Sequence, residues 1–209
     1  MSKRAQQKQQ RYQSIIATAK ELFLERGVEN IQMQDIATAA EIGIATLFRY
    51  FPKKEFLVVA ASNAITDEMA TDIGHIVAQK LTAFERIEKI LDYYMGTMED
   101  PKLRLPRFFE SVDLYDKIAE EAPAQYEEYL AARSKLADIL LSLSAQGGHD
   151  GSLRPGVDLD LFVMTMVQNY SLFTYKSSLV AHDENLSELL SAGKQLLMMK
   201  DVFLRYIKS

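Results

Sequence analysis

Apolar residues recur at helical spacing along nearly the whole chain, and this periodicity constrains the fold more than any other feature. No convincing run with strand-like alternation is bounded by turn residues. The sequence therefore predicts an all-α fold with an N-terminal three-helix unit and a larger C-terminal helical bundle. Residues 146–156, rich in glycine, are expected to form a loop. Helices are expected at about residues 10–26, 32–39, 44–51, 53–74, 83–98, 104–120, 123–145, 158–179 and 185–208.

The composition excludes several classes of protein. With 209 residues, of which 48% are hydrophobic and 25% charged, the chain resembles a globular protein of one large or two modest domains. No apolar run approaches the roughly 18–20 residues that a membrane span needs, and the polar N-terminus lacks the apolar core of a secretion signal. The absence of cysteine excludes disulfides and thiol catalysis. We therefore expect a cytoplasmic protein with no membrane segment.

The charge is distributed unevenly along the chain. The net charge is −5, yet residues 1–57 hold nine Lys or Arg against six Asp or Glu. Such asymmetry indicates that one end of the chain meets a polyanion. The Gln-rich first thirteen residues are expected to form a frayed arm, with a solvated surface as the alternative role for its four cations: Lys3, Arg4, Lys8 and Arg11.

Residues 32–51 have the pattern of a helix-turn-helix, two short helices joined by a tight turn and packed on a longer first helix. The second short helix would end before Pro52, which cannot continue the hydrogen-bond ladder. The small or apolar residues that such a unit places against its core are all present: Ile36, Ala37, Ala40, Ile42, Leu47 and Phe51.

The outward face of the second short helix predicts a contact with DNA. Ile44 and Ala45 suit apolar contact with thymine methyl groups, and the hydroxyls of Thr46 and Tyr50 can bind phosphates. Lys53 and Lys54 open the next helix, where free N–H groups favour an anion. The helix is thus expected to lie in a DNA major groove. On these residues alone, a partner-binding or core segment remains the alternative.

Residues 15–57 resemble the DNA-binding domain of the TetR family of bacterial repressors. The resemblance implies a helix-turn-helix DNA-binding domain over residues 9–69, with the motif itself at about 32–51, and an effector-binding and dimerisation domain over residues 70–209. The remaining chain is similar to the family only in its helicity and length. The matching elements are Ala19, Leu22-Phe23, Gly27, Asp35-Ile36-Ala37, Ala40, Thr46-Leu47-Phe48, Tyr50-Phe51 and Lys54-Glu55.

Three positions depart from the family pattern. Glu41 stands where the turn usually has glycine, which costs roughly 1 kcal/mol in a left-handed conformation. Gly43 replaces the serine that commonly caps the second short helix, the one expected to lie in the major groove, and is a weaker but acceptable cap. Gln32 replaces the Ser or Thr that usually opens the first short helix, which leaves a phosphate or capping contact there in doubt.

The resemblance assigns DNA-binding roles by position. Gln34 matches a base-reading residue able to pair with an adenine edge. Thr46, Tyr50 and Lys54 match positions that grip phosphate. Base sequence would be read by Ile44, Ala45 and Arg49. Phe48 stands where tyrosine is usual and, lacking a hydroxyl, can only pack against the sugar-phosphate backbone.

In such regulators the second domain binds a small effector and dimerises through its last two helices. Both of these helices are apolar on nearly all sides here, as a helix covered on two faces must be. Glu110 and Asp113 could meet a cationic ligand, although a solvated face is the alternative. The candidates for binding a largely apolar effector are aromatic, methionine and amide residues that could equally be core: Tyr93, Tyr94, Met98, Phe108, Phe109, Tyr126, Met166, Asn169, Tyr170 and Phe173.

We therefore expect a ligand-responsive, DNA-binding transcriptional regulator: a repressor, by resemblance, that binds a palindromic operator as a homodimer and is released by its effector. The alternative is a helical small-molecule-binding or interaction protein that does not read DNA. An enzyme is not expected, since the chain has no phosphate loop, nucleophile elbow or paired histidines at metal spacing. His75, His149 and His182 are scattered, and no catalytic residue, metal or cofactor is predicted.

Overall fold

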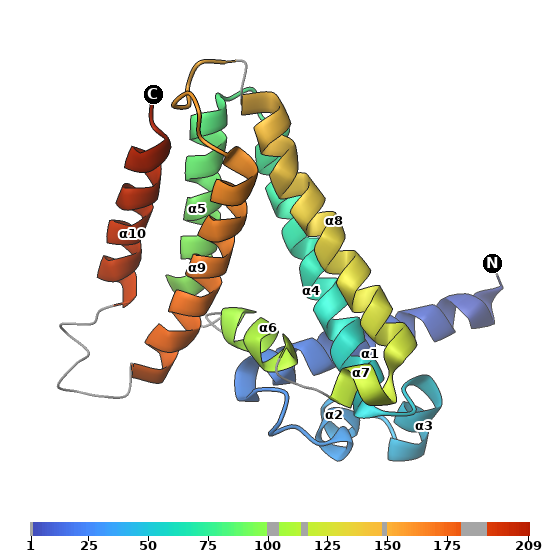
Figure 1. Ribbon diagram of the computed structural model, residues 1–209. Helices are drawn as coiled ribbons and strands as arrows, with labels where there is room; N and C mark the ends of the chain where they lie inside the picture. The colour runs from blue at the N-terminus through green and yellow to red at the C-terminus, as the bar shows by residue number, and fades with distance from the viewer. Residues whose placement is uncertain (1, 100–104, 114–116, 148–149, 181–191) are drawn as a thin grey trace. The chain divides into compact units, whose positions relative to one another are not determined.

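The described part of the chain is helical apart from short connections and one isolated bridge (Figure 1). The computed structural model describes residues 2–99, 105–113, 117–147, 150–180 and 192–209. This architecture confirms the predicted all-α fold. The helices are α1 Lys3–Arg26, α2 Met33–Ala39, α3 Ile44–Tyr50, α4 Lys54–Val77, α5 Ala83–Glu99, α6 Leu105–Asp113, α7 Lys117–Glu121, α8 Pro123–Gly147, α9 Leu159–Val180 and α10 Ala192–Ile207.

The first helix begins earlier than expected. Helix α1 starts at Lys3, and the side chain of Ser2 caps it by accepting a hydrogen bond from the backbone N–H of Ala5 at 3.3 Å. The prediction of a frayed arm is therefore wrong for residues 3–13. The physical reason is local: Lys, Arg, Gln and Ala all favour the helix, and a serine N-cap satisfies one of its free N–H groups.

Two other predicted boundaries fall on residues outside the described part. The single helix expected at residues 104–120 is described as α6 and α7, on either side of residues 114–116, which lie outside the described part. Within the described residues the last helix covers Ala192–Ile207, and its predicted start at residue 185 lies outside them. The described helices include none that is long and apolar enough to cross a membrane.

The chain divides into two compact units. Unit 1 comprises residues 1–67 and 108–133, and unit 2 comprises residues 68–107 and 134–209. Unit 1 therefore combines the N-terminal helices with most of α6, α7 and the first part of α8. The functional division into residues 9–69 and 70–209 stays a prediction.

The core of unit 1 forms around one face of α1. Ile15, Ala19 and Phe23 are at most 1% exposed, and the ring of Phe23 lies 6.4 Å from that of Phe108 on α6. Burial of such side chains is the main stabilising term in folding. The spacing of four residues between these α1 positions puts them on one side of the helix.

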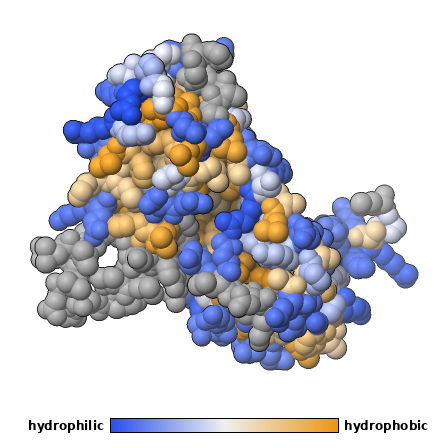
Figure 2. Space-filling model, viewed as in Figure 1, coloured by the Kyte–Doolittle hydropathy of each residue, from blue (hydrophilic) through white to orange (hydrophobic). Residues whose placement is uncertain are grey.

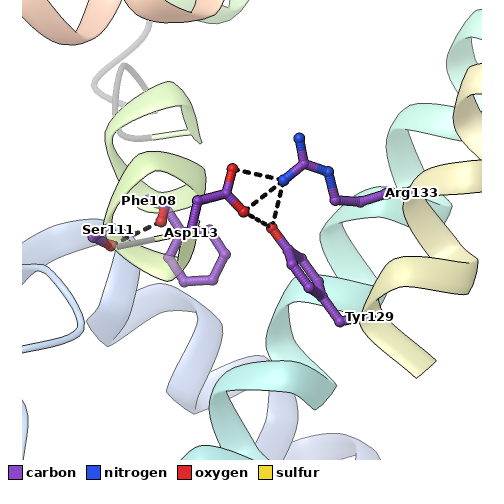
Figure 3. Close-up of polar contacts among 5 residues, drawn as sticks. All are labelled: Phe108, Ser111, Asp113, Tyr129 and Arg133. Carbon is purple, nitrogen blue, oxygen red and sulfur yellow. Dashed lines mark hydrogen bonds and ion pairs between the residues drawn. The ribbon is translucent and has the colours of Figure 1, made fainter. Parts of the chain in front are cut away.

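A polar cluster joins α6 to α8 within unit 1 (Figure 3). One nitrogen of Arg133, Nη1, lies 2.5 and 2.6 Å from the two carboxylate oxygens of Asp113 and 2.8 Å from the hydroxyl of Tyr129. The same hydroxyl donates to Asp113 at 2.5 Å. The sequence left Asp113 as a candidate for a cationic ligand or a solvated face. In the structure Asp113 instead forms an ion pair with Arg133 of the same chain.

Unit 2 is built around α5, α9 and α10, which lie side by side (Figure 1). Lys200 of α10 forms an ion pair with Asp92 of α5 at 2.5 Å, and the Tyr170 hydroxyl of α9 donates to the Leu196 carbonyl at 3.3 Å. The predicted loop has a structural role, because Asp150 accepts a hydrogen bond from the backbone N–H of Ala83 at 2.7 Å and so caps α5. Its hydrogen bonds, first those from Ser152, hold the pKa of Asp150 below its usual range.

Candidate nucleic-acid interface

The turn between α2 and α3 is a Schellman motif. The backbone N–H of Ile42 donates to the carbonyl of Ala37 at 3.0 Å, and that of Glu41 donates to Thr38 at 3.1 Å. Glu41 has a φ of 53°, the left-handed conformation that a glycine adopts without strain. The turn geometry therefore needs a glycine-like residue at the position where the sequence departs from the family pattern.

The N-termini of the two short helices are capped in different ways. Gly43 is the N-cap of α3, with an extended backbone and no side chain to accept a hydrogen bond. At α2 the backbone N–H of Gln32 donates to the carboxylate of Asp35 at 2.8 Å. This contact is the return half of a capping box, so Asp35 fixes the start of α2 in the absence of a serine or threonine.

The predicted core positions of the helix-turn-helix separate into two groups. Ile36, Ala37 and Leu47 are fully buried, and Phe51 is 2% exposed. Ala40 and Ile42, the C-cap of α2 and the turn residue, are only partly buried. One side of α3 is thus anchored through Leu47, which leaves its other sides available.

The proposed DNA-binding side chains lie on α2, α3 and the first residue of α4. Gln34, Ala45, Phe48 and Arg49 are exposed, and the Phe48 side chain is unusually so for its type, at 45%. Figure 2 shows apolar side chains among hydrophilic ones on the surface of this unit. Partial burial is found at the other four positions: Ile44, Thr46, Tyr50 and Lys54. All eight thus lie within residues 34–54, on the helix-turn-helix and the first residue of α4.

Lys53 has a partner that local sequence gave no sign of. Its amine lies 3.2 Å from Glu121 Oε2 and 3.4 Å from the Glu121 backbone carbonyl oxygen, at the end of α7. The two residues are 68 positions apart, so no short-range pattern indicates the pair. The expectation that Lys53 is simply available to a phosphate omits this competing carboxylate.

The candidate effector-binding residues are divided between the two units. Phe108, Phe109 and Tyr126 belong to unit 1, where Phe108 is buried against Phe23. The side chain of Met98 lies outside the described part. Asn169 is exposed and donates to the carbonyl of Thr165 at 2.7 Å. The remaining candidates belong to unit 2, where they are buried or partly buried: Tyr93, Tyr94, Met166, Tyr170 and Phe173.

Two short helices are joined by a Schellman turn, and their outward face carries Ala45, Phe48 and Arg49. This arrangement defines a helix-turn-helix transcriptional regulator, a DNA-binding protein. Residues 15–61 match the family model described as bacterial regulatory proteins, tetR family. This part of the chain is therefore a TetR-type DNA-binding domain, and the protein is a DNA-binding transcriptional regulator.

Similar proteins extend the comparison to the rest of the chain. A fatty acid metabolism regulator of Bacillus subtilis is 25% identical over 203 residues, which are 90% of this chain and 97% of that protein. A TetR/AcrR-family regulator from Thermobifida fusca has a solved structure with 25% identity and a TM-score of 0.68, covering 93% of this chain and 97% of that one. FadR of Bacillus subtilis, solved in complex with stearoyl-CoA, has the same fold at 15% identity, with a TM-score of 0.65 and coverage of 94% and 99%.

Proposed function

We propose that this regulator acts in the bacterial cytoplasm as a repressor, inserting α3 into the major groove of a palindromic operator. The exposed side of α3, opposite the buried Leu47, is the observation that carries this proposal. A helix anchored on one side can present the other to base edges in a groove about 12 Å wide.

The contacts differ in what they determine. Arg49 is exposed and long enough to reach guanine O6 and N7, while Ala45 and Ile44 lie where they can contact thymine methyl groups. Gln34 lies on the neighbouring helix, where Thr38 accepts a weak hydrogen bond from its amide at 3.5 Å. These four side chains are proposed to read sequence.

The remaining contacts position the protein on the backbone. Thr46 and Tyr50 offer hydroxyls to phosphates, and Lys54 opens α4, where the helix dipole also favours an anion. Phe48, with its ring nearly half exposed, packs against the sugar-phosphate backbone. Such contacts set affinity and register but carry no sequence information directly.

A second copy of the chain is proposed to cover α9 and α10. Met198, Val202 and Tyr206 follow one another at intervals of four residues along α10, and each is more than half exposed. Leu161 and Leu172 form a second exposed pair, eleven residues apart on α9 and therefore on one face of the helix. Figure 2 shows apolar side chains at the surface of unit 2. Two copies related by two-fold symmetry would match a palindromic operator.

The dimer is tested by a charge placed in the exposed α10 stripe. Val202→Glu should convert a species of twice the chain mass into a monomer in analytical ultracentrifugation at micromolar concentration, and should weaken operator binding. Asp201→Glu, one residue away and already acidic, is the matched control and should stay dimeric. A wild-type monomer insensitive to concentration would exclude the dimer.

The effector is proposed to be an acyl-CoA thioester. The similarity to a fatty acid metabolism regulator and to a stearoyl-CoA complex supports this class. Unit 2 offers Met166 and Phe173 for an acyl chain and the hydroxyls of Tyr93 and Tyr94 for polar anchoring. Burial raises the pKa of both tyrosines, and at Tyr93 the charge of Asp72 and a hydrogen bond to it add to the effect.

The function as a whole is tested by selecting bound fragments from genomic DNA with the purified protein. We expect a palindrome whose half-site centres are about 34–36 Å apart, or a multiple of that distance. Stearoyl-CoA should then reduce binding to that fragment. Recovery of no enriched sequence, or binding equally strong to all DNA, would contradict operator recognition. Failure of stearoyl-CoA alone would overturn only the effector class.

A further inference from the structure

Unit 1 contains a cavity of about 430 Å³ that the DNA-binding and effector roles do not use. Its wall is built by α1, by the end of α3, by the middle of α4 and by the start of α8. The residues that carry its chemistry are Tyr12, Tyr50, Phe51, Phe56, Asn63, Asp67 and Glu128. A volume of this size is typical of a small-molecule site.

The cavity wall is acidic and aromatic. Asp67 and Glu128 supply two carboxylates, and among the described residues the lining includes no Lys or Arg. The Tyr12 and Phe51 rings stack with their centroids 4.9 Å apart. Burial raises the pKa of the Tyr12 hydroxyl, and the charge of Glu128 raises it further. The wall therefore repels anions, and its ring faces and carboxylates attract a cation.

Asn63 adds a polar group with no partner. Its side-chain oxygen is buried, and no hydrogen-bond donor in the described structure reaches it. A buried acceptor is normally satisfied by the protein, by water or by a ligand. Asn63 lines the cavity, so its side-chain amide adds polar character to the wall, although this oxygen itself is closed off from the open space.

We propose that this cavity binds a small organic ammonium ion with an aromatic body. The ammonium group lies near Glu128 and Asp67, while the aromatic body packs against Tyr12, Phe51 and Phe56. This site is separate from the acyl-CoA site proposed for unit 2. Tyr50, a proposed phosphate contact, also lines the cavity, so an occupant touches the helix that reads DNA.

The test uses three probes of similar shape and different charge on the full chain without DNA: 4-phenylbutylammonium, 4-phenylbutanol and 4-phenylbutyrate. Binding is followed by NMR of alanine methyl groups, because Ala60 and Ala64 line the cavity and Ala39 and Ala45 do not. The ammonium probe should shift the first pair and leave the second unmoved. It should bind roughly tenfold more tightly than the alcohol, and the carboxylate should not bind.

Variants locate the charge recognition. Glu128→Gln should weaken binding of the ammonium probe about three- to tenfold while leaving the alcohol unchanged. Glu127→Gln, its neighbour outside the cavity wall, is the matched control and should bind as the wild type does. Equal affinity for all three probes, unmoved Ala60 and Ala64 methyls, or an unaltered Glu128→Gln variant would each overturn the proposal. None of these outcomes depends on operator binding.

Discussion

The amine of Lys53 lies 3.2 Å from a carboxylate oxygen of Glu121, which ties the residue before α4 to the end of α7. The two side chains are 47% and 43% exposed, so the pair contributes little to stability. The pair matters because Glu121 competes with DNA phosphates for the Lys53 amine, which lies next to the proposed phosphate contact of Lys54. Anything that removes the carboxylate makes Lys53 available to DNA.

We therefore predict that Glu121→Gln binds DNA more tightly than the wild type. The released Lys53 can neutralise one more phosphate, which should steepen the dependence of log K on log salt by about 0.9. Filter binding or fluorescence anisotropy across a salt series measures this slope. Glu120→Gln removes the same charge one residue away and should leave the slope unchanged; a steeper slope in that control would mean that net charge alone is responsible.

The turn residue gives a prediction about stability. Glu41→Gly should stabilise the protein by up to about 1 kcal/mol, because glycine adopts the left-handed φ of 53° without a Cβ clash. Urea unfolding followed by circular dichroism measures the difference. The same substitution at Glu21, inside α1, should instead destabilise by about 1 kcal/mol. Destabilisation at both sites would mean that Glu41 makes a favourable contact that outweighs its backbone strain.

The local parts of this fold were predictable from sequence, since a helix-turn-helix depends on residues close together in the chain. Leu47 and Phe51 are buried as expected, and the left-handed turn falls on Glu41. The N-terminal arm is helical from Lys3 and is capped by Ser2, and periodicity alone did not indicate this early start.

Long-range pairs could not be predicted in the same way. Arg133 meets Asp113 across 20 residues, and Lys53 meets Glu121 across 68. Neither pair has a sequence spacing that distinguishes it from many other combinations of opposite charges. The cavity beside Tyr12 needs four helices to be packed before it exists. The aromatic candidates for effector binding show the same limit, because spacing does not tell which compact unit each will join.

The two classes of DNA contact should respond differently to mutation. Arg49→Ala should relax preference at particular bases by about 1–3 kcal/mol, because it removes a base-edge contact. Lys54→Ala should weaken binding almost equally on all sequences and lower the salt slope by about 0.9, because it removes a phosphate contact. Competitive binding to a set of single-base operator variants separates these outcomes. A Lys54→Ala protein with an unchanged salt slope would show that Lys54 does not contact phosphate.

The polar cluster of α6 and α8 predicts how stability depends on alkaline pH. Burial, and then the hydrogen bond to Asp113, raise the pKa of Tyr129. The unfolded chain releases this proton near pH 10 while the folded chain retains it, so stability is lost as the pH rises above about 10. Tyr129→Phe should cost about 1 kcal/mol at neutral pH. The difference from the wild type should then shrink as the pH rises further.

Urea midpoints measured between pH 8 and about 11 test this sign. Ser111→Ala is a matched control, since its hydroxyl donates to the Phe108 carbonyl at 2.7 Å in the same region (Figure 3) and has no proton to lose in this range. Its cost should be independent of pH. If the difference in unfolding free energy between Tyr129→Phe and the wild type stayed constant across this pH series, the folded chain would not retain the Tyr129 proton as proposed.

The last prediction concerns coupling between effector and operator. An effector releases DNA only by binding more tightly to a form of the dimer whose two α3 helices no longer match successive major grooves. If stearoyl-CoA weakens operator binding a hundredfold, the operator must weaken stearoyl-CoA binding a hundredfold as well, a coupling of roughly 2.7 kcal/mol. Calorimetric titration of stearoyl-CoA with and without operator measures both sides of this relation.

Asn169 provides a variant for the same experiment. It is exposed on α9 between the buried Met166 and Tyr170, and Asn169→Trp adds bulk beside the proposed effector residues. If Asn169 borders that site, the variant should lose its response to stearoyl-CoA. Its affinity for the operator should then stay at the value of the effector-free protein or at the value of the effector-bound protein, whether or not stearoyl-CoA is added. Thr165→Trp, one turn earlier and also exposed, is the comparison and should keep the response. Equal stearoyl-CoA affinity with and without operator in the wild-type protein would mean that unit 2 does not sense this ligand on behalf of the DNA-binding helices, whatever else it binds.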